Sequence, residues 1–168
     1  MGKTTLLKSV LHQRPQVEHI VGSAVLRELA GPDFARFDFL PACTKIAYRE
    51  KAVTWMEDHQ AASQLHLLCD GHTALLDEST GCVESVFTAS DCRFFHELIL
   101  MDADEDLVLQ RRQGDTSKRR SLDPAVIAAE LDAERRTVHS IAAQWGLTLH
   151  LLPPEPCAAA VALIEILS

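Results

Sequence analysis

The sequence lacks the features that would place the protein in a membrane or on a nucleic acid. Its apolar runs all fall well short of the ~20 residues that a helix needs to cross a bilayer. It also lacks an excess of positive charge, since its 168 residues carry a net charge of −8. An acidic chain gains nothing overall from a nucleic-acid backbone or an anionic lipid surface. We therefore expect neither a membrane nor a nucleic acid as partner.

Metal-binding and redox motifs built on cysteine are also lacking. The five cysteines are odd in number, and no two of them have C-x-x-C spacing. The eight histidines are scattered and form no H-E-x-x-H motif. We therefore expect reduced thiols in a cytoplasmic protein and no structural zinc site.

The chain contains instead an alternation of apolar strand patterns and amphipathic helix patterns. Such alternation predicts a parallel sheet in an α/β fold. With no repeat or linker, residues 1–168 are expected to form one domain. The expected strands span residues 17–21, 65–70, 96–101 and 147–152, with a small hairpin within 74–88. The expected helices span residues 3–13, 24–30 (with Ser23 as N-cap), 41–62, 105–113, 124–145 (with Asp123 as N-cap and Gly146 as C-cap) and 157–167, while 33–40 are expected to be irregular.

The first residues of the chain resemble part of a phosphate-binding loop. Gly2-Lys3-Thr4-Thr5 opens the first helix and matches the end of the P-loop, G-x-x-x-x-G-K-[ST]. In that motif backbone N–H groups surround the nucleotide phosphates, the lysine contacts the β and γ phosphates, and the following hydroxyl binds Mg²⁺. We interpret these four residues as an ATP-binding segment. The alternative is an ordinary helix start with a capping threonine.

An acidic residue ends the apolar strand at 65–70. Asp70 is followed by Gly71 and His72, and ligands of open α/β sheets bind outside the carboxyl ends of the strands. Asp70 is a candidate for holding the water of Mg²⁺, for orienting a substrate, or for acting as a general base if the acceptor is a hydroxyl group. His72 is a candidate substrate-binding residue. Both residues could instead serve the turn alone.

Cations are concentrated in one loop of this acidic chain. Arg111, Arg112, Lys118, Arg119 and Arg120 flank or lie in the polar segment 114–122. Phosphoryl transfer needs cations that close over the transferring group, so this segment is a candidate lid. A solvated basic face is the alternative.

The other charged residues are expected either to bind the acceptor or to face the solvent. Arg27, after the second strand, is a candidate clamp for an acceptor phosphate, with a surface helix arginine as the alternative. Arg49 is expected on the surface, and the charged residues of 130–136 are expected to form solvated pairs along their helix.

These segments together resemble the P-loop nucleoside monophosphate kinases, and among them the archaeal-type adenylate kinases. The resemblance rests on GKTT, VEHIVGSAVLREL, LHLLCDGH, LILMDADEDLVLQRR and GDTSKRRSLD. It implies a three-layer P-loop NTPase fold with a parallel sheet of order 2-3-1-4-5, the first strand of which is missing here. It further implies an acceptor-side helical region at 22–62 and a short lid at 111–123.

The resemblance also implies an ATP-dependent kinase that uses Mg²⁺ and a small phosphoryl acceptor, most simply a nucleoside monophosphate. Two alternatives stay open, a kinase of another metabolite or polynucleotide end, and a nucleotide-binding regulatory module with little turnover. The implied sites comprise Gly2, Lys3, Thr4, Thr5 and Lys118 for ATP; Thr4 and Asp70 for Mg²⁺, partly through water; Ser23, Arg27, Asp70 and His72 for the acceptor; and Lys3, Asp70, Arg112, Arg119 and Arg120 for catalysis.

An absent first strand has a cost that can be estimated. Each buried backbone group left unpaired costs on the order of 1–3 kcal/mol, against a total stability of roughly 5–15 kcal/mol. We expect the chain to be unstable, to pair strands 65–70 and 96–101 directly, or to show a gap between them. We also expect the codons before Met1 to encode about five apolar residues and a glycine-rich turn, as in a complete P-loop.

Overall fold

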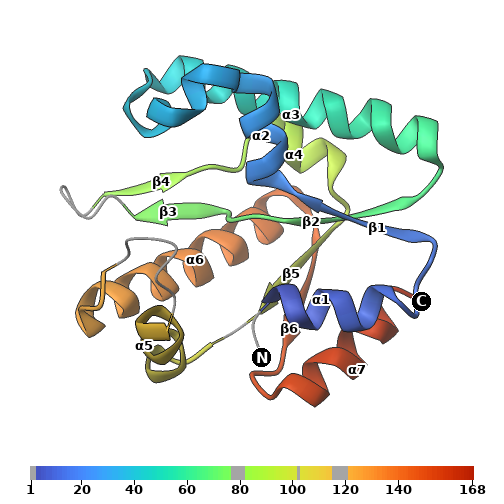
Figure 1. Ribbon diagram of the computed structural model, residues 1–168, viewed down its shortest axis with the longest axis vertical. Coiled ribbons are helices and arrows are strands. Elements are labelled where there is room, and N and C mark those ends of the chain that lie inside the picture. The colour runs from blue at the N-terminus through green and yellow to red at the C-terminus, as the bar shows by residue number, and fades with distance from the viewer. Residues whose placement is uncertain (1–2, 77–81, 102, 115–120) are drawn as a thin grey trace.

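The computed structural model describes residues 3–76, 82–101, 103–114 and 121–168. These residues form a mixed α/β structure in which helices lie on both sides of the strands (Figure 1). The elements in chain order are α1 (Lys3–Leu11), β1 (Val17–Val21), α2 (Gly22–Ala30), the 3₁₀ helix η1 (Gly31–Phe39), α3 (Ala42–Ser63), β2 (His66–Asp70), β3 (Ala74–Leu76), β4 (Val83–Ser85), α4 (Ala89–Phe94), β5 (Glu97–Met101), α5 (Glu105–Gly114), α6 (Pro124–Trp145), β6 (Thr148–Leu152) and α7 (Pro156–Ile166).

The strands form separate pairs. β1 runs parallel to β2, with Val17 opposite His66 and Val21 opposite Asp70. β5 runs parallel to β6, and β3 pairs with β4 in an antiparallel hairpin. Over the residues described here, β2 and β5 therefore belong to different two-stranded sheets, and no five-stranded parallel sheet is formed. Direct pairing of strands 65–70 and 96–101, one of the outcomes expected from the sequence, is therefore not found among these residues.

Helices α1 and α7 cover one face of both parallel pairs. Their buried side chains form one apolar cluster with β6 (Leu6, Leu7, Val10, Leu152, Ala159 and Leu163). Leu68 of β2 packs against this cluster from one pair, and Ile99 and Met101 of β5 pack against it from the other. The helix α1 therefore contacts both pairs.

The opposite face is covered by α2, α3, α4 and α6. Ile20 of β1 packs with Val53 and Met56 of α3, while Leu98 of β5 packs with Val138 and Ile141 of α6. Neighbouring residues along each strand thus face different helix layers, as the alternation of a pleated strand requires. Three layers result, with the strands in the middle.

The ends of α6 confirm the sequence prediction. The Asp123 carboxylate accepts a hydrogen bond from the Ala125 N–H at 2.8 Å, and Pro124 occupies the first turn. Gly146 ends the helix in the left-handed region, at φ 67°, where a residue without a Cβ is favoured.

Two local predictions are wrong, and one short helix was missed. Ser23 does not cap α2, because the helix begins at Gly22 and its N-cap residue, Val21, makes no side-chain cap. Residues 33–40 are not irregular, since most of them lie in η1. The short helix α4 was not predicted, although Thr88 and Asp91 form a complete capping box there.

No helix within the described residues is both long and apolar enough to cross a membrane.

The cluster between α1 and α7 predicts a stability difference. Leu163 is 1% exposed in this cluster, whereas Leu151 of β6 is 58% exposed. Truncating a fully buried leucine to alanine costs about 2–5 kcal/mol, so Leu163→Ala should lower the thermal midpoint by at least several degrees. Leu151→Ala should leave it within about 2 °C. Thermal unfolding followed by circular dichroism measures both, and equal midpoints would contradict the assigned core.

Candidate functional site

The carboxyl ends of the parallel strands define the candidate site. β1 leads into α2 at Gly22, and β2 ends at Asp70 directly beside it: a Cβ on Gly22 would lie 3.5 Å from the Asp70 carbonyl oxygen. Helix α1 begins near the carboxyl end of β5, as Figure 1 shows. In open α/β sheets this edge is where ligands bind.

The structure places Asp70 on the face of β2 that α1 covers. Asp70 lies two residues after Leu68, which packs against the α1 cluster, so both side chains point to the same face. The Asp70 carboxylate is 3.9 Å from Nε2 of His19 in β1, and the two side chains are only 15% and 21% exposed. A carboxylate held here can bind a cation or a hydroxyl group.

His19 is a candidate site residue that the sequence reading missed. Its Nε2 is buried and has no hydrogen-bond partner among the described residues. Most buried polar atoms have a hydrogen-bond partner, so this ring nitrogen is a candidate position for a bound water or ligand oxygen. The only signal in the sequence was a polar residue at the centre of the short apolar strand VEHIV.

His72 and its neighbours are held by α6. The Nδ1 of His72 lies 3.7 Å from the Glu134 carboxylate. That carboxylate also accepts hydrogen bonds from Thr73, at 2.8 Å from the backbone N–H and 2.9 Å from the hydroxyl. Burial alone would raise the pKa of Glu134, but His72 and the Thr73 hydrogen bonds outweigh burial and hold the pKa below its ordinary value. The turn after Asp70 is thus fixed to α6, and Glu134 is not part of a solvated helix pair.

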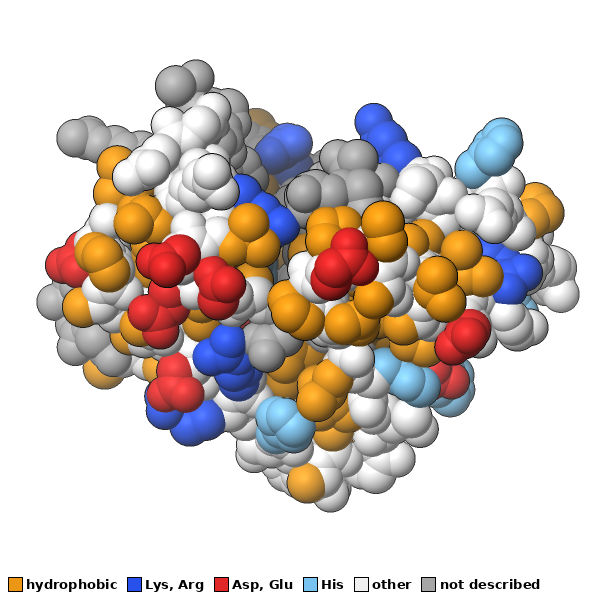
Figure 2. Space-filling view, turned by 90° about the horizontal axis from the view of Figure 1, so that it is seen from below, with side chains coloured by type: hydrophobic (Ala, Val, Ile, Leu, Met, Phe, Trp, Pro, Cys, Tyr) orange, Lys and Arg blue, Asp and Glu red, His pale blue; other side chains and the backbone are white. Residues whose placement is uncertain are grey.

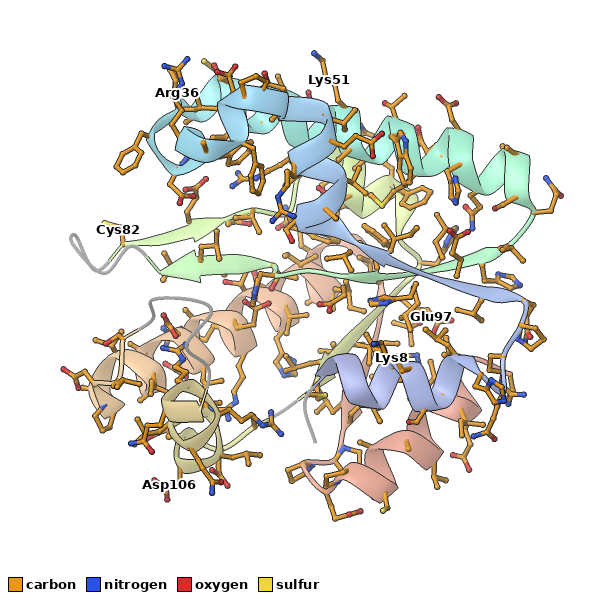
Figure 3. All side chains as sticks on the ribbon, viewed as in Figure 1. Lys8, Arg36, Lys51, Cys82, Glu97 and Asp106 are labelled. Atoms are coloured by element: carbon orange, nitrogen blue, oxygen red, sulfur yellow. The ribbon has the colours of Figure 1, made fainter. Side chains whose placement is uncertain are left out.

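The candidate acceptor residues lie on α2. Ser23 and Arg27 are both exposed, and the Arg27 guanidinium lies over the ring of Phe34 in η1, at 4.9 Å from its centroid. A cation stacked in this way keeps its N–H donors available at the ring edges. Arg36 and Lys51, on η1 and α3, project away from the strands (Figure 3).

Only part of the basic cluster at α5 lies in the described residues. Arg112 is 12% exposed and forms an ion pair with Glu130 of α6. It also donates to the backbone oxygen of Ser121 at 3.0 Å, so it joins α5 to α6. Lys118, Arg119 and Arg120 lie outside the described residues.

Arg111 lies at a different place from Arg112. Together with Met101 of β5, Leu6 of α1 and Pro153 and Pro154 after β6, it lines a small pocket at the strand ends. Its volume of about 10 Å³ is room for no more than one water molecule. The sequence reading assigned Arg111 only to the basic cluster and missed this pocket.

A second charge cluster joins α3 to the β3–β4 hairpin. Arg49 is buried rather than on the surface, as the sequence reading had it. Lys45 and Arg49 contact the carboxylate of Glu84 at 2.8 and 3.0 Å. The hydrogen bond from Lys45 and the nearby Arg49 lower the pKa of Glu84, against the effect of burial. Glu84 lies 39 residues after Lys45, so the sequence alone could not identify it as the partner of these cations.

The candidate phosphate-binding segment is described only in part. Lys3, Thr4 and Thr5 form the first turn of α1, as predicted. Gly2 and the side chains of residues 3–5 lie outside the described part of the structure.

Asp70 is the described residue on which the predicted Mg²⁺ site depends. Within the described part of the chain no three His, Cys, Asp or Glu side chains come together. Mg²⁺ at a nucleotide site needs only one or two protein oxygens, because phosphates and waters supply the rest. The Asp70 carboxylate at the strand end fits that role.

No protein-family model matches this chain, and no curated protein matches it significantly.

Glu134 predicts a pH dependence. A carboxyl group whose pKa is lowered by folding stabilises the folded state at pH values above its ordinary pKa of 4.5. This contribution is lost as the pH falls through the folded-state pKa. Glu134→Gln should lower the thermal midpoint at pH 7 and should flatten its decline between about pH 5 and pH 3. The exposed Glu57 provides the control Glu57→Gln. Identical pH profiles for the Glu134 variant and the wild type would show that the contact is absent in solution.

Proposed function

We propose that this protein is an ATP-binding phosphotransferase of the P-loop kinase type, which moves the γ-phosphoryl group of ATP to a small acceptor, most simply a nucleoside monophosphate. The observation that supports it best is the placement of Asp70. It ends a parallel strand, and its carboxylate lies on the face covered by α1, the helix that Gly-Lys-Thr-Thr opens. An acid and a phosphate-binding turn around one strand edge suit ATP with Mg²⁺.

The proposed fold is the three-layer P-loop NTPase fold with a parallel sheet of order 2-3-1-4-5. In this scheme β1, β2, β5 and β6 correspond to strands 2, 3, 4 and 5 of that order. Its support is that the observed parallel pairs, β1 with β2 and β5 with β6, are neighbours in that order.

Each group has a role in the proposed reaction. The N–H groups at the start of α1 and the Lys3 ammonium bind the phosphates, and Thr4 and Asp70 hold Mg²⁺, partly through water. ATP supplies the phosphoryl group when bound. Ser23, Arg27 and His72 bind the acceptor, and Lys118, Arg119 and Arg120 stabilise charge on the phosphoryl oxygens. Because a phosphate acceptor is already an anion, the proposed reaction with a nucleoside monophosphate needs no general base.

One observation favours a second candidate, a nucleotide-binding regulatory module with little turnover. Arg112, a proposed catalytic cation, is largely buried and tied to Glu130 and Ser121. Because Nη1 and Nη2 of this guanidinium already join two helices, fewer of its donors can reach a phosphoryl group. In this reading the protein binds ATP at the same strand edge without transferring phosphate.

Substitutions at Lys3 and Arg119 separate the two candidates. In a kinase, Lys3→Ala should abolish ATP binding, while Arg119→Ala should retain binding and lose roughly 100-fold or more in turnover. Lys8→Ala is the control, because Lys8 is exposed on the same helix. Calorimetry with ATP·Mg²⁺ and a phosphoryl-transfer screen over nucleoside monophosphates, small metabolites and polynucleotide ends measure both properties. ATP binding lost in Lys3→Ala, with no turnover in any variant or in the wild type, would favour the regulatory module.

Arg27 predicts an effect on the acceptor alone. If its guanidinium binds the acceptor phosphate, Arg27→Ala should raise the acceptor KM by about 10- to 100-fold, as expected for losing a hydrogen bond between charged groups. The ATP affinity should not change. Arg36→Ala is the matched control, since Arg36 bonds only its neighbour Asp33 in the described structure. An unchanged acceptor KM in Arg27→Ala would remove Arg27 from the site.

A further inference from the structure

An open pocket lies between the end of α3, the start of β2 and the end of α4. Its volume is about 390 Å³, within the range of ~300–1,000 Å³ that is usual for small-ligand sites. β2 begins beside the pocket and ends at Asp70, so the pocket and the proposed nucleotide site are at opposite ends of this strand. The side chains that line it include Glu57, Gln60, Gln64, Leu65, His66 and Phe94.

The side chains that α3 contributes to the pocket offer hydrogen-bond acceptors. Nε2 of Gln60 donates to the backbone oxygen of Leu65 at 3.3 Å. Nε2 of Gln64 donates to the backbone oxygen of Ala61 at 2.7 Å. Because backbone carbonyls hold both amide nitrogens, the amide oxygens of the two glutamines are the atoms left for a ligand. The exposed Glu57 adds a carboxylate, with two more acceptor oxygens and a negative charge.

The pocket has no lysine or arginine among the described residues that line it. In the sequence, neither residue type occurs between Lys51 and Arg93. Arg93 precedes Phe94 on α4, but it is exposed and its guanidinium donates to Ser90 of the same helix at 3.1 Å. The formal charge that α3 brings to the pocket is therefore negative.

Gln64 has a backbone conformation that glycine adopts more easily. It ends α3 in the left-handed region, at φ 58°, and it is the one non-glycine residue with a positive φ in the described part of the chain. Glycine is the usual residue at such a helix end, because a Cβ makes this conformation less favourable. A strained position that keeps a long side chain is a reason to look for a role of that side chain, and here the side chain lines the pocket.

The exposed surface of α7 differs from this pocket in its chemistry. Apolar side chains gather over α7 (Figure 2), and Val161 is 58% exposed there. Among the described residues of that surface we find no set of acceptors comparable to the one at the end of α3. The pocket beside α3 is therefore the feature whose chemistry selects a class of ligand.

We propose that this pocket binds a small organic cation, an alkyl amine or an alkyl guanidine. Its N–H groups donate to the Glu57 carboxylate and to the amide oxygens of Gln60 and Gln64, and its carbon chain lies against Leu65 and Phe94. A cation of this class needs both the acceptors and the apolar wall that the pocket provides. The proposal is independent of ATP binding and phosphoryl transfer, which are assigned to the other end of the strands.

Titration of the nucleotide-free, ¹⁵N-labelled protein with agmatine tests the proposal. Agmatine carries a guanidinium and an ammonium group on a short carbon chain, and 1-hexanol is a neutral control of similar length. Agmatine should give saturable amide shifts centred on residues 57–66 and Phe94, with a Kd below about 1 mM. 1-Hexanol should give none. Since no readout involves ATP, failure of the kinase proposal leaves this test intact.

Two neighbouring acids on α3 provide a matched pair of variants. Glu57→Gln removes the charge in the pocket and should weaken agmatine binding about tenfold or more, as expected for losing a hydrogen bond between charged groups. Asp58 is also exposed but does not line the pocket, so Asp58→Asn should change the affinity by less than about twofold. Equal affinities in the two variants would overturn the proposal.

Gln64→Gly separates the role of the side chain from the stability of the helix end. Glycine adopts the left-handed conformation freely but lacks the amide group. The variant should therefore raise the thermal midpoint by about 2 °C or more and weaken agmatine binding about fivefold or more. The proposal is also wrong if Gln64→Gly binds agmatine as well as the wild type does, if 1-hexanol gives the same shifts, or if agmatine gives no saturable shift by about 10 mM.

Discussion

The packing of α1 against both parallel pairs is the constraint on which the rest of the structure depends. Leu6, Leu7 and Val10 lie in one buried cluster with α7, and strands of both pairs pack against that cluster. β2 and β5 share no ladder in the described residues. Apolar contacts with the helices, and not backbone hydrogen bonds, therefore hold the two strand pairs together. Burial is non-directional, so it can hold two pairs in one layer without fixing a register between them.

The same helix covers one side of the candidate site. α1 starts where the strands end, and the carboxylate of Asp70 lies on the face that α1 covers. His19 adds a buried ring nitrogen beside that carboxylate. Glu134 fixes the turn after Asp70 from the side of α6, and Glu84 joins the hairpin to α3. The candidate site is therefore framed by contacts between elements that are distant in the sequence, which limits how far its parts can move independently.

Much of the fold could be predicted because its signals are local. Continuous apolar runs identified β2, β5 and β6, and Asp123-Pro124 and Gly146 marked both ends of α6. The capping box at Thr88 and Asp91 was a usable signal for α4 that was overlooked. Burial of Arg49 and the role of Glu134 could not be predicted, because the partner of each lies on an element 35 to 61 residues away. Arg112 shows the same limit, because its partner Glu130 lies 18 residues further along the chain, on α6.

The most direct measurement is a crystal structure of the protein with Mg²⁺ and a non-hydrolysable ATP analogue. Our interpretation predicts the triphosphate at the first turn of α1, between the carboxyl ends of β2 and β5, with Asp70 near the metal. A nucleotide bound elsewhere, or none bound at millimolar concentration, would contradict the assignment of this edge as an ATP site.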